Sequence, residues 1–525
     1  MKLAIDGELA GRIDKYSIEN GMPSMVLIER AAMRIAERVM QKRVEKGTRN
    51  IAVVCSVGNN GADGLAAIRL LQAKEYGVHA YITGSIEHAT EEFKAQLKLA
   101  KIFNIPVTEW NEDIHEDVFD VYDIIVDAIF GTGLSRNVEG ECARLIDCIN
   151  KSGKLVVAVD IPSGINSADG RIMGTAVKAE CTVTFGYIKL GEMLYPGKDY
   201  AGELFVEDIG LLPYDFESNP PKIGSSAQYF TRRELAFSIP EREGQSNKGD
   251  YGKPLIIAGS EDMTGAAFMS AKAAYMTGAG VVTVITHCSA DPYLKSVLPE
   301  AIVKSYDDEP EKVLKNAVRK ATVIVIGPGM SVSETSKRIV KYVLLNSKVP
   351  VIADADALNI ISENTEEWLN SAEYRSFTYP LIVTPHVGEM SRLSGYTVSE
   401  IASNIPHYAL EFAHKYRVYC VLKDGVSAVA SPEGEVFLTT AGNPGMATAG
   451  CGDVLTGILA AVEAWKDIPL FKKLAMGVQI HGAAGDAAAI GCGQYSLMAR
   501  HVIDSIPSIL TGRHWVPTLP DMVYI

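Results

Sequence analysis

Paired cysteines are missing from this chain. No two of its eight cysteines stand in a C-x-x-C pair, and most lie in apolar or glycine-rich stretches. This pattern indicates reduced, largely buried thiols and favours a cytoplasmic location. The first twenty residues also lack the apolar centre of a signal peptide, so we expect none. The cysteines are at positions 55, 142, 148, 181, 288, 420, 451 and 492.

Long apolar runs and an excess of positive charge are absent as well. No stretch of about 18 apolar residues occurs, so the sequence predicts no membrane span. The chain has 50 Lys and Arg residues against 64 Asp and Glu residues, a net charge of −14. This charge disfavours non-specific binding to nucleic acid, because little of the surface would pair with phosphates. A small anionic ligand is still possible, since backbone N–H groups at helix N-termini can hold it.

What is present is enough apolar sequence for two compact domains. Hydrophobic residues make up 47% and charged residues 22%, an ordinary globular composition. A chain of 525 residues exceeds what one core usually organises. Segment 210–228 contains three prolines and no hydrophobic period, which predicts a linker. We therefore expect a first domain at 1–212, a linker at 213–228 and a second domain at 229–525.

Short, β-rich apolar segments alternate with helical patterns in both halves. The alternation predicts two α/β domains, each a mostly parallel sheet with helices on both faces. The predicted strands are 51–54, 79–83, 122–126, 155–159, 181–185, 204–206, 254–258, 280–285, 322–326, 349–353, 381–383 and 419–422. The predicted helices include 24–41, 65–77, 266–277, 452–465 and 474–490.

Three loops of the first half carry Asp or Asn beside glycine, each after a predicted strand. They are 57–64 (VGNNGADG), 127–134 (DAIFGTGL) and 160–164 (DIPSG). Glycine lets the backbone turn sharply and approach a ligand, and a helix start offers N–H groups to phosphate. Any one of these loops alone could be a helix cap. Ligands bind beyond the C-terminal strand ends of open parallel sheets, so the three together predict one site.

These loops, with segment 185–191 (FGYIKLG), resemble those of NAD(P)HX epimerase domains over most of the first half. The resemblance implies a Rossmann-like three-layer domain that interconverts the R and S hydrates of NADH and NADPH. It also implies a K⁺ site at Asn59, Asp127 and Ser163, whose oxygen atoms suit a hard cation. The implied substrate-binding residues are Asn59, Asn60, Gly61, Ala62, Asp63, Gly131, Thr132, Gly133, Leu134, Ser135, Arg136, Asn137 and Asp160.

Epimerisation needs proton transfers during reversible loss or migration of the C6 hydroxyl of the hydrated ring. A carboxylate and an ammonium group beside that carbon could carry the protons. Asp160 and Lys189 are the candidates, although Lys189 could instead be a surface lysine. The family usually has Gly where this chain has Ala62, and one extra methyl group should fit.

The most specific pattern of the second half is the run 442–453 (GNPGMATAGCGD), which leads into an apolar helix. Several glycines before a helix build an anion hole that can stabilise charge on a transferred phosphoryl group. Asp453, at the helix start, can take a proton from a substrate hydroxyl; alternatively it only caps the helix. The run does not contain the G-x-x-x-x-G-K-[ST] pattern of Walker loops.

The run resembles the GxGD signature of ribokinase-like kinases, and six further segments narrow the resemblance to ADP/ATP-dependent NAD(P)HX dehydratases. A ribokinase-like three-layer domain is implied, with ADP or ATP and Mg²⁺. The six segments are 247–252, 263–267, 327–330, 354–358, 384–390 and 423–425. The implied contacts to the hydrate are Ala266, Gly329, His386 and Asp453. The implied nucleotide-binding residues are Lys423, Asp424, Gly425, Val426, Ser427, Asn443, Gly445, Met446, Ala447, Thr448, Ala449, Gly450, Cys451 and Gly452.

A dehydration mechanism follows from these parts. Asp453 would take the proton of the C6 hydroxyl, which attacks the terminal phosphate, because phosphate leaves more readily than hydroxide. One well-placed base contributes roughly 10²–10⁴-fold. Mg²⁺ would bridge the nucleotide phosphates, with Glu389 as an indirect ligand. Cys451 stands where the family often has Thr or Ser, and His481 is interpreted as a packing residue.

The main interpretation is a bifunctional enzyme that repairs NADHX and NADPHX: an isomerase that epimerises them and a lyase that dehydrates the S form with ADP or ATP. The resemblance favours ADP and a homo-oligomer. One alternative is a vitamin-precursor kinase of the hydroxyethylthiazole or hydroxymethylpyrimidine type, with a non-catalytic nucleotide-binding first domain. Another is a first half that acts only as an interaction module.

Overall fold

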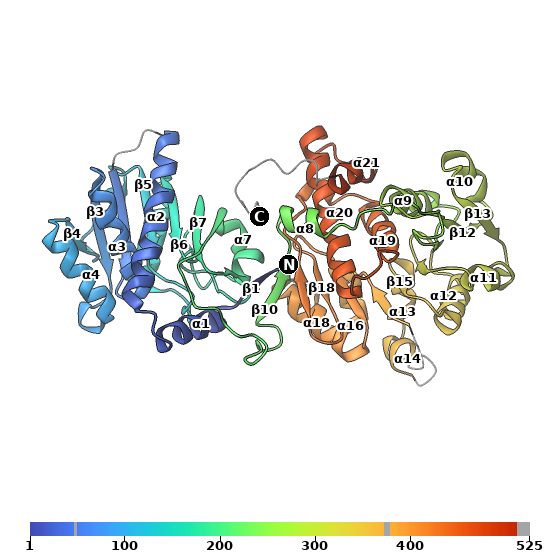
Figure 1. Cartoon of the computed structure of the whole chain (residues 1–525), viewed down its shortest axis with the longest axis horizontal. Coiled ribbons are helices and arrows are strands. Elements are labelled where there is room, and N and C mark those ends of the chain that lie inside the picture. Colours follow the sequence, from blue (N-terminus) through green and yellow to red (C-terminus); the bar gives the residue numbers. More distant parts are fainter. Residues whose placement is uncertain (47–49, 372–378, 512–525) are drawn as a thin grey trace. The chain divides into compact units, whose positions relative to one another are not determined.

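The structure is a computed structural model, and it describes residues 1–46, 50–371 and 379–511. Contacts divide the chain after Ala227, giving an N-terminal unit of Leu3–Ala227 and a C-terminal unit that begins at Gln228 and takes in Met1 and Lys2 (Figure 1). The division falls near the end of the predicted linker, whose own bounds stay a prediction. Among the described residues, no helix is long and apolar enough to cross a bilayer.

The N-terminal unit is built on a seven-stranded, fully parallel sheet. Its order is β4-β3-β2-β5-β6-β7-β9, so the first strand of the sheet lies inside and the order reverses between β2 and β5. This is the Rossmann-type order, and ligands bind at its reversal point. The strands are β2 Asn50–Ser56, β3 Gly77–Thr83, β4 Val107–Glu109, β5 Ile124–Ala128, β6 Leu155–Val159, β7 Cys181–Phe185 and β9 Glu203–Glu207.

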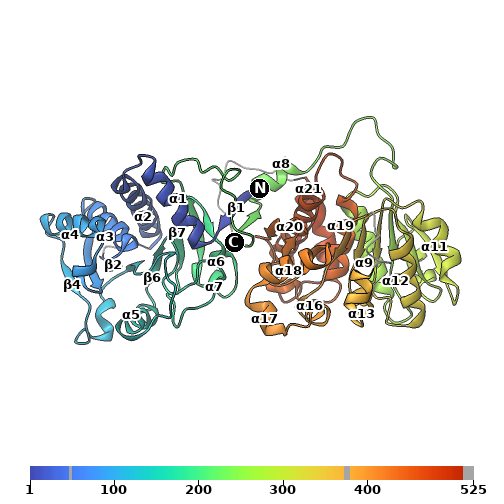
Figure 2. The ribbon, with the colours of Figure 1, turned by 90° about the horizontal axis from the view of Figure 1, so that it is seen from below.

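Helices cover both faces of this sheet, as Figure 2 shows. Alternate residues of β2 divide between two apolar cores: Val53 packs with α2, α3 and α4, while Val54 packs with α5 on the other face. A separate parallel pair joins β1 to β8. The remaining elements are β1 Lys2–Ile5, α1 Gly7–Glu19, α2 Ser24–Lys46, α3 Asn59–Gln72, η1 Ile86–His88, α4 Glu91–Ile102, η2 Glu116–Phe119, α5 Gly140–Lys151, β8 Ile188–Lys189, α6 Leu190–Met193 and α7 Gly197–Ala201.

The sheet of the C-terminal unit has the order β13-β12-β11-β14-β15-β16-β17-β18-β19-β10. It is parallel from β13 to β17, and β18 is antiparallel to both of its neighbours. The strand order again reverses once, between β11 and β14. The strands are β10 Ser226–Tyr229, β11 Pro254–Ile257, β12 Thr283–His287, β13 Ile302–Tyr306, β14 Val323–Ile326, β15 Val351–Ala353, β16 Leu381–Val383, β17 Tyr419–Leu422, β18 Ala428–Ala430 and β19 Val436–Leu438.

Figure 1 shows α9, α19, α20 and α21 gathered on one side of this sheet. The helix α19 is buried nearly all round and packs against α9, where a side chain at Gly457 would stand 2.1 Å from the carbonyl oxygen of Ser270. The helices are α8 Arg232–Ser238, α9 Thr264–Met276, α10 Asp291–Val297, α11 Pro310–Val318, α12 Glu334–Asn346, α13 Asp356–Ser362, α14 Thr365–Asn370, α16 Val387–Ser394, α17 Val398–Ser403, α18 Ile405–Tyr416, η3 Pro444–Met446, α19 Cys451–Val462, α20 Leu470–Cys492 and α21 Ala499–Leu510.

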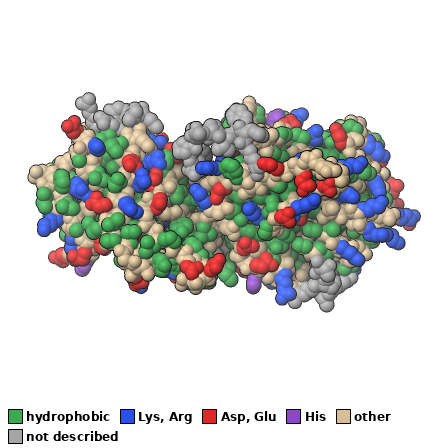
Figure 3. Space-filling view, in the orientation of Figure 1, with side chains coloured by type: hydrophobic (Ala, Val, Ile, Leu, Met, Phe, Trp, Pro, Cys, Tyr) green, Lys and Arg blue, Asp and Glu red, His purple; other side chains and the backbone are tan. Residues whose placement is uncertain are grey.

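The predicted α/β class is confirmed, and every predicted strand has a counterpart whose ends differ by at most a few residues. The prediction missed β1, β4, β8, β10, β13, β18 and β19. Of these, β13 has the sequence IVKSY and an exposed edge, so it lacks a continuous apolar run, and the other six have two to four residues each. Acidic and basic side chains are interspersed over the face of each unit that Figure 3 shows.

Candidate active sites

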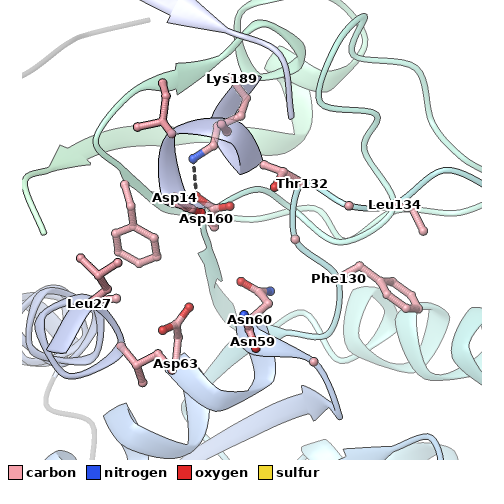
Figure 4. Close-up of a pocket in the computed structure, with 18 of the residues that line it drawn as sticks. Asp14, Leu27, Asn59, Asn60, Asp63, Phe130, Thr132, Leu134, Asp160 and Lys189 are labelled. Atoms are coloured by element: carbon pink, nitrogen blue, oxygen red, sulfur yellow. Dashed lines mark hydrogen bonds and ion pairs between the residues drawn. The ribbon is translucent and has the colours of Figure 1, made fainter. Parts of the chain in front are cut away.

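A cavity of about 570 Å³ opens at the reversal point of the N-terminal sheet. Its floor consists of the loops that follow β2, β5 and β6, and residues of α1 and α2 form the opposite wall. Figure 4 shows Asn59, Asn60 and Asp63 on one side of this cavity and Asp14, Asp160 and Lys189 on the other. The three loops that were predicted to form one site thus line the same cavity, whereas the α1 wall was not predicted.

A buried ion pair lines one side of this cavity. Lys189 is only 2% exposed, and its ammonium group pairs with the Asp160 carboxylate and donates to Thr184 Oγ1 at 2.8 Å. Asp160 has a φ of +67°, a conformation that non-glycine residues adopt at a cost of order 1–3 kcal/mol. The surrounding strands hold it there, since its N–H donates to Val183 at 2.8 Å. Lys189 is thus not a surface lysine. The strained backbone conformation of Asp160 accompanies the contact of its carboxylate with the Lys189 ammonium group.

Two further carboxylates share this cavity. Solvent reaches Asp14 through the open cavity, yet the surrounding protein and then the charge of Asp160 raise the pKa of Asp14 to about 6. Burial, followed by the charges of Asp160 and Asp14, raises the pKa of Asp63 well above its usual range. Three carboxyl groups around one ammonium group favour retention of a proton. Asp14 was not predicted, because in the sequence it stands at an ordinary polar position of an amphipathic helix.

The predicted K⁺ ligands Asp127 and Ser163 are in direct contact. Ser163 Oγ donates to Asp127 Oδ1 at 2.6 Å, and Ser163 N donates to Oδ2 at 2.9 Å. Both side chains are fully buried, and burial raises the pKa of Asp127 to about 6. Asn59, the third predicted ligand, lines the cavity, whereas Asp127 and Ser163 lie behind its wall.

The first turn of α3 presents both backbone and side chains to the cavity. The N–H groups of Asn60 and Gly61 have no acceptor within the described chain, as expected at a helix start. The Nδ2 atom of Asn60 is also buried without a partner among those residues. A side chain at Gly61 would stand 1.8 Å from the carbonyl oxygen of Ser56, so α3 can approach β2 only with glycine here.

Most of the predicted substrate-binding residues line the cavity. Three of them do not: Gly61 packs against β2, Ala62 is buried in the apolar core, and Asn137 lies outside the lining. The extra methyl group of Ala62 therefore faces the protein core. The predicted residues that line the cavity are Asn59, Asn60, Asp63, Gly131, Thr132, Gly133, Leu134, Ser135, Arg136 and Asp160.

In the C-terminal unit, Asp453 occupies the first turn of α19. Gly450, with a φ of +91°, forms the N-cap, and the N–H groups of Gly452 and Asp453 have no acceptor within the described chain. These groups form an anion-binding helix start of the expected kind. Burial, followed by the charge of Asp354, raises the pKa of Asp453 to about 7. A carboxyl group with this pKa can exchange protons near neutral pH.

A buried lysine lies beside this helix start. Lys423 Nζ pairs with Asp354 Oδ1 at 2.7 Å and lies 4.0 Å from Glu389 Oε2. Burial lowers the pKa of Lys423, but the two carboxylates outweigh it and the pKa is raised overall. A side chain at Gly452 would stand 3.4 Å from Lys423 Nζ and 3.6 Å from Asp354 Oδ2. Glycine at that position therefore brings the anion-binding backbone next to a permanent positive charge.

The glycine-rich loop before α19 is anchored from α20. Asp486 accepts from Gly442 N at 3.0 Å and from Asn443 Nδ2 at 2.9 Å, while Asn443 Oδ1 accepts from Gly445 N at 3.1 Å. Asp486 was not predicted, because it lies more than 40 residues beyond Gly442 and Asn443, within an apolar helix. It fixes the loop without touching the helix start itself.

The structure brings two of the predicted hydrate contacts together, since a side chain at Gly329 would stand 2.8 Å from Ala266 Cβ. His386 is the N-cap of α16: its Nδ1 accepts from Gly388 N at 2.9 Å, and its ring is half exposed. His481 Nε2 is buried without a partner in the described chain, and burial lowers the pKa of His481 to about 4. Among the predicted nucleotide-binding residues, Val426 is buried.

Comparisons with known proteins match both units. Residues 24–191 match the profile of the YjeF-related protein N-terminus, and residues 254–508 match that of NAD(P)H-hydrate dehydratase. The bifunctional NAD(P)H-hydrate repair enzyme of Thermofilum pendens is 33% identical, over 97% of this chain and 96% of that protein. Its counterpart in Moorella thermoacetica is 34% identical, over 95% of each.

A solved structure also aligns with the C-terminal half. The ADP/ATP-dependent NAD(P)H-hydrate dehydratase of Bacillus subtilis, co-crystallised with ATP and Mg²⁺, is 30% identical. The alignment covers 54% of this chain and 97% of that one, with a TM-score of 0.48.

The fold and the two sites define a two-unit α/β enzyme that combines an acid–base cavity with an anion-binding helix start. Within this class, the chain belongs to the family of bifunctional NAD(P)H-hydrate repair enzymes. The resemblance inferred from the motifs is thereby confirmed for both halves. The alternative of a vitamin-precursor kinase is not favoured, because the similarity to the repair enzymes extends over both halves.

Proposed function

We propose that the N-terminal cavity interconverts R- and S-NAD(P)HX and that the C-terminal site converts S-NAD(P)HX to NAD(P)H with ADP or ATP. The observation that most strongly supports this proposal is that each site combines a buried ammonium group with a carboxyl group of raised proton affinity. Lys189 with Asp14 serves in one, and Lys423 with Asp453 in the other. The bounds 1–212, 213–228 and 229–525, the cytoplasmic location and the homo-oligomer stay predictions.

In the epimerase site, the Asp160–Lys189 pair would move the protons of the C6 hydroxyl. Protonation of that oxygen lets it leave with the help of the ring nitrogen, and its return to the opposite face inverts C6. Asp14, which retains a proton up to about pH 6, would act as a third acid–base group. The dinucleotide phosphates would bind the N–H groups of the α3 start.

The proposed K⁺ would be held by Asn59, Asp127 and Ser163. The fit is chemical: a carboxylate and a hydroxyl group are already in contact, and all three donor atoms would be oxygens. When bound, the ion would supply a fixed positive charge beside the substrate loops and lower the proton affinity of Asp127. Because Asp127 and Ser163 are buried behind the cavity wall, Asn59 would be the ligand that faces the cavity.

In the dehydratase site, Asp453 would take the proton of the C6 hydroxyl as this oxygen attacks the terminal phosphoryl group. The bond between that group and the rest of the nucleotide breaks, so AMP or ADP leaves. Gly452 and Lys423 would stabilise the charge that develops on the phosphoryl oxygens. The C6–O bond then breaks, phosphate leaves with the bonding electrons, and loss of the C5 proton restores the dihydropyridine ring. Ala266, Gly329 and His386 would contact the hydrate.

The loops 423–427 and 443–452 would bind the nucleotide, anchored through Asp486. When bound, Mg²⁺ would neutralise charge on the nucleotide phosphates. Glu389, which is buried beside Lys423, would help to hold the ion as an indirect ligand.

The direct test supplies a mixture of R and S hydrates to the full chain with ADP or ATP and Mg²⁺. We expect complete recovery of the dihydronicotinamide absorbance with nucleotide, and only interconversion of the epimers by chromatography without it. Accumulation of a stable phosphorylated product would instead favour the kinase alternative. Recovery of the S fraction alone would refute the proposed epimerase site.

A further inference from the structure

Three side chains that could bind a metal ion converge in the C-terminal unit, and none belongs to either site described above. They are His287 and Cys288, which end and follow β12, and Asp307, which follows β13. Their ligand atoms all lie within 4.8 Å of one another. The cluster joins residues about twenty positions apart in the chain.

The sheet itself places these residues together. His287 pairs in register with Tyr306 across the parallel strands, and Cys288 N donates to Tyr306 O at 3.0 Å. The residues that follow in each strand, Cys288 and Asp307, are therefore held side by side by backbone hydrogen bonds. The His287 ring is further fixed edge-on against the Tyr306 ring, with centroids 5.9 Å apart.

The His287 ring is oriented for ligation. Its Nδ1 lies 2.7 Å from Ser289 Oγ and 3.4 Å from Ser289 N, whose N–H points at it; in the tautomer with a proton on Nδ1, the ring donates to the hydroxyl group. Such a bond to the outer nitrogen is the usual way in which proteins fix a metal-binding imidazole. The opposite nitrogen, Nε2, faces Cys288 Sγ at 3.9 Å. Its lone pair is then available where the sulfur also points.

The spacing matches a particular class of ion. With Zn–S near 2.3 Å and Zn–N near 2.0–2.1 Å, a tetrahedral site separates nitrogen and sulfur by roughly 3.6 Å. The observed 3.9 Å needs only a small closing movement. Thiolate and imidazole ligands select zinc over the harder magnesium and potassium ions. The carboxylate of Asp307 supplies the second negative charge.

We propose that His287, Cys288 and Asp307 bind Zn²⁺, with water as the fourth ligand. Binding of the ion releases the proton of the Cys288 thiol, because the thiolate is the form that ligates zinc. The bound ion joins the ends of the two edge strands. Its role is therefore in stabilising the β12–β13 edge, and the reaction proposed above does not depend on it.

The test uses the full chain, stripped with a chelator and titrated with Co²⁺ as a spectroscopic probe. We expect one equivalent to produce thiolate-to-cobalt absorption in the near ultraviolet and Zn²⁺ to displace it. Cys288→Ser should abolish this band, and Asp307→Asn should weaken binding about tenfold or more. Co²⁺ bound at oxygen-only sites gives no such band.

Cys492→Ser is the matched control, because Cys492 Sγ also lies near a histidine, 3.6 Å from His501 Nδ1. No carboxylate completes that pair within the described residues. This variant should keep the cobalt band and its affinity. Absence of the band in the unaltered chain, or an equal band in Cys288→Ser, would overturn the proposal. A zinc-dependent rise in unfolding temperature that Cys288→Ser removes would support it independently.

Discussion

We expect individual carboxyl groups to set the chemistry of this protein, and Asp453 is the clearest example. It lies in the first turn of α19 next to backbone N–H groups that have no acceptor within the described chain, where a negative charge is favoured, yet burial raises its pKa to about 7. A general base works best when its pKa lies near the operating pH. At this position the helix start favours the charged form of Asp453, whereas burial keeps the carboxylate basic enough to accept a proton.

The pH dependence of dehydration should report this group. Because the base must be ionised, kcat/KM should rise about tenfold per pH unit below about 7 and level off above it. Asp453→Asn should lower the rate by roughly 10²–10⁴-fold and remove this dependence. Asp504→Asn, which changes an exposed carboxylate on α21, should leave both unchanged. A pH profile of Asp453→Asn that matches the unaltered chain would exclude Asp453 as the base.

Asp14 should give a pH dependence of opposite sign in epimerisation. If its protonated form supplies the proton, the rate should fall as the pH rises through about 6. Asp14→Asn should slow epimerisation by roughly 10²-fold and flatten the profile. Chromatographic measurement of R/S interconversion checks this, with the exposed Asp113→Asn as control. An unaltered profile in Asp14→Asn would leave Asp14 without a role in proton transfer.

Most of the residues predicted from the sequence lie in glycine-rich loops. Asp160 and Asp453 follow strands or precede helices in recognisable motifs, so their placement could be expected. Asp14 and Asp486 lie on helices whose patterns show only amphipathicity or burial. Their partners are distant in the chain, and only the packing of those helices brings them to the sites.

At the scale of elements, small residues determine how closely the helices approach the sheets. A side chain at Gly64 would stand 2.6 Å from Ala128 Cβ, and one at Gly61 would meet the backbone of Ser56. The first turn of α3 can therefore lie directly at the reversal point. The strands themselves were predictable from their apolar runs, whereas β13 and β18 were not, because edge exposure and short length remove that pattern.

Gly61→Ala should push α3 away from β2. We expect the free energy of unfolding to fall by about 1–3 kcal/mol, because the added carbon meets backbone that cannot move away. Gly11→Ala, inside α1 with no atom within 4 Å, should be neutral or stabilising by up to about 1 kcal/mol. Urea unfolding of both variants measures these changes. Equal stability of Gly61→Ala and the unaltered chain would show that α3 can lie further from β2 without loss of stability.

For the whole molecule, the two activities should be separable by single substitutions. Asp453→Asn should abolish dehydration and preserve R/S interconversion, whereas Lys189→Met should do the reverse with pure S-NAD(P)HX as substrate. Each site is built from residues of one unit, so neither change removes a group of the other. Loss of both activities in a variant that remains folded, as judged by circular dichroism, would contradict the assignment of two sites.

Each proposed site is built from residues of one unit, and this has a consequence for how the hydrate travels. We expect an R molecule to be released into water before it meets an epimerase site, on the same polypeptide or on any other. An equimolar mixture of Asp453→Asn and Lys189→Met chains should then clear both epimers about as fast as half the amount of intact protein. Fusion of the two domains would then keep the two activities in equal amounts. The hydrate released by one chain would be available to every other chain.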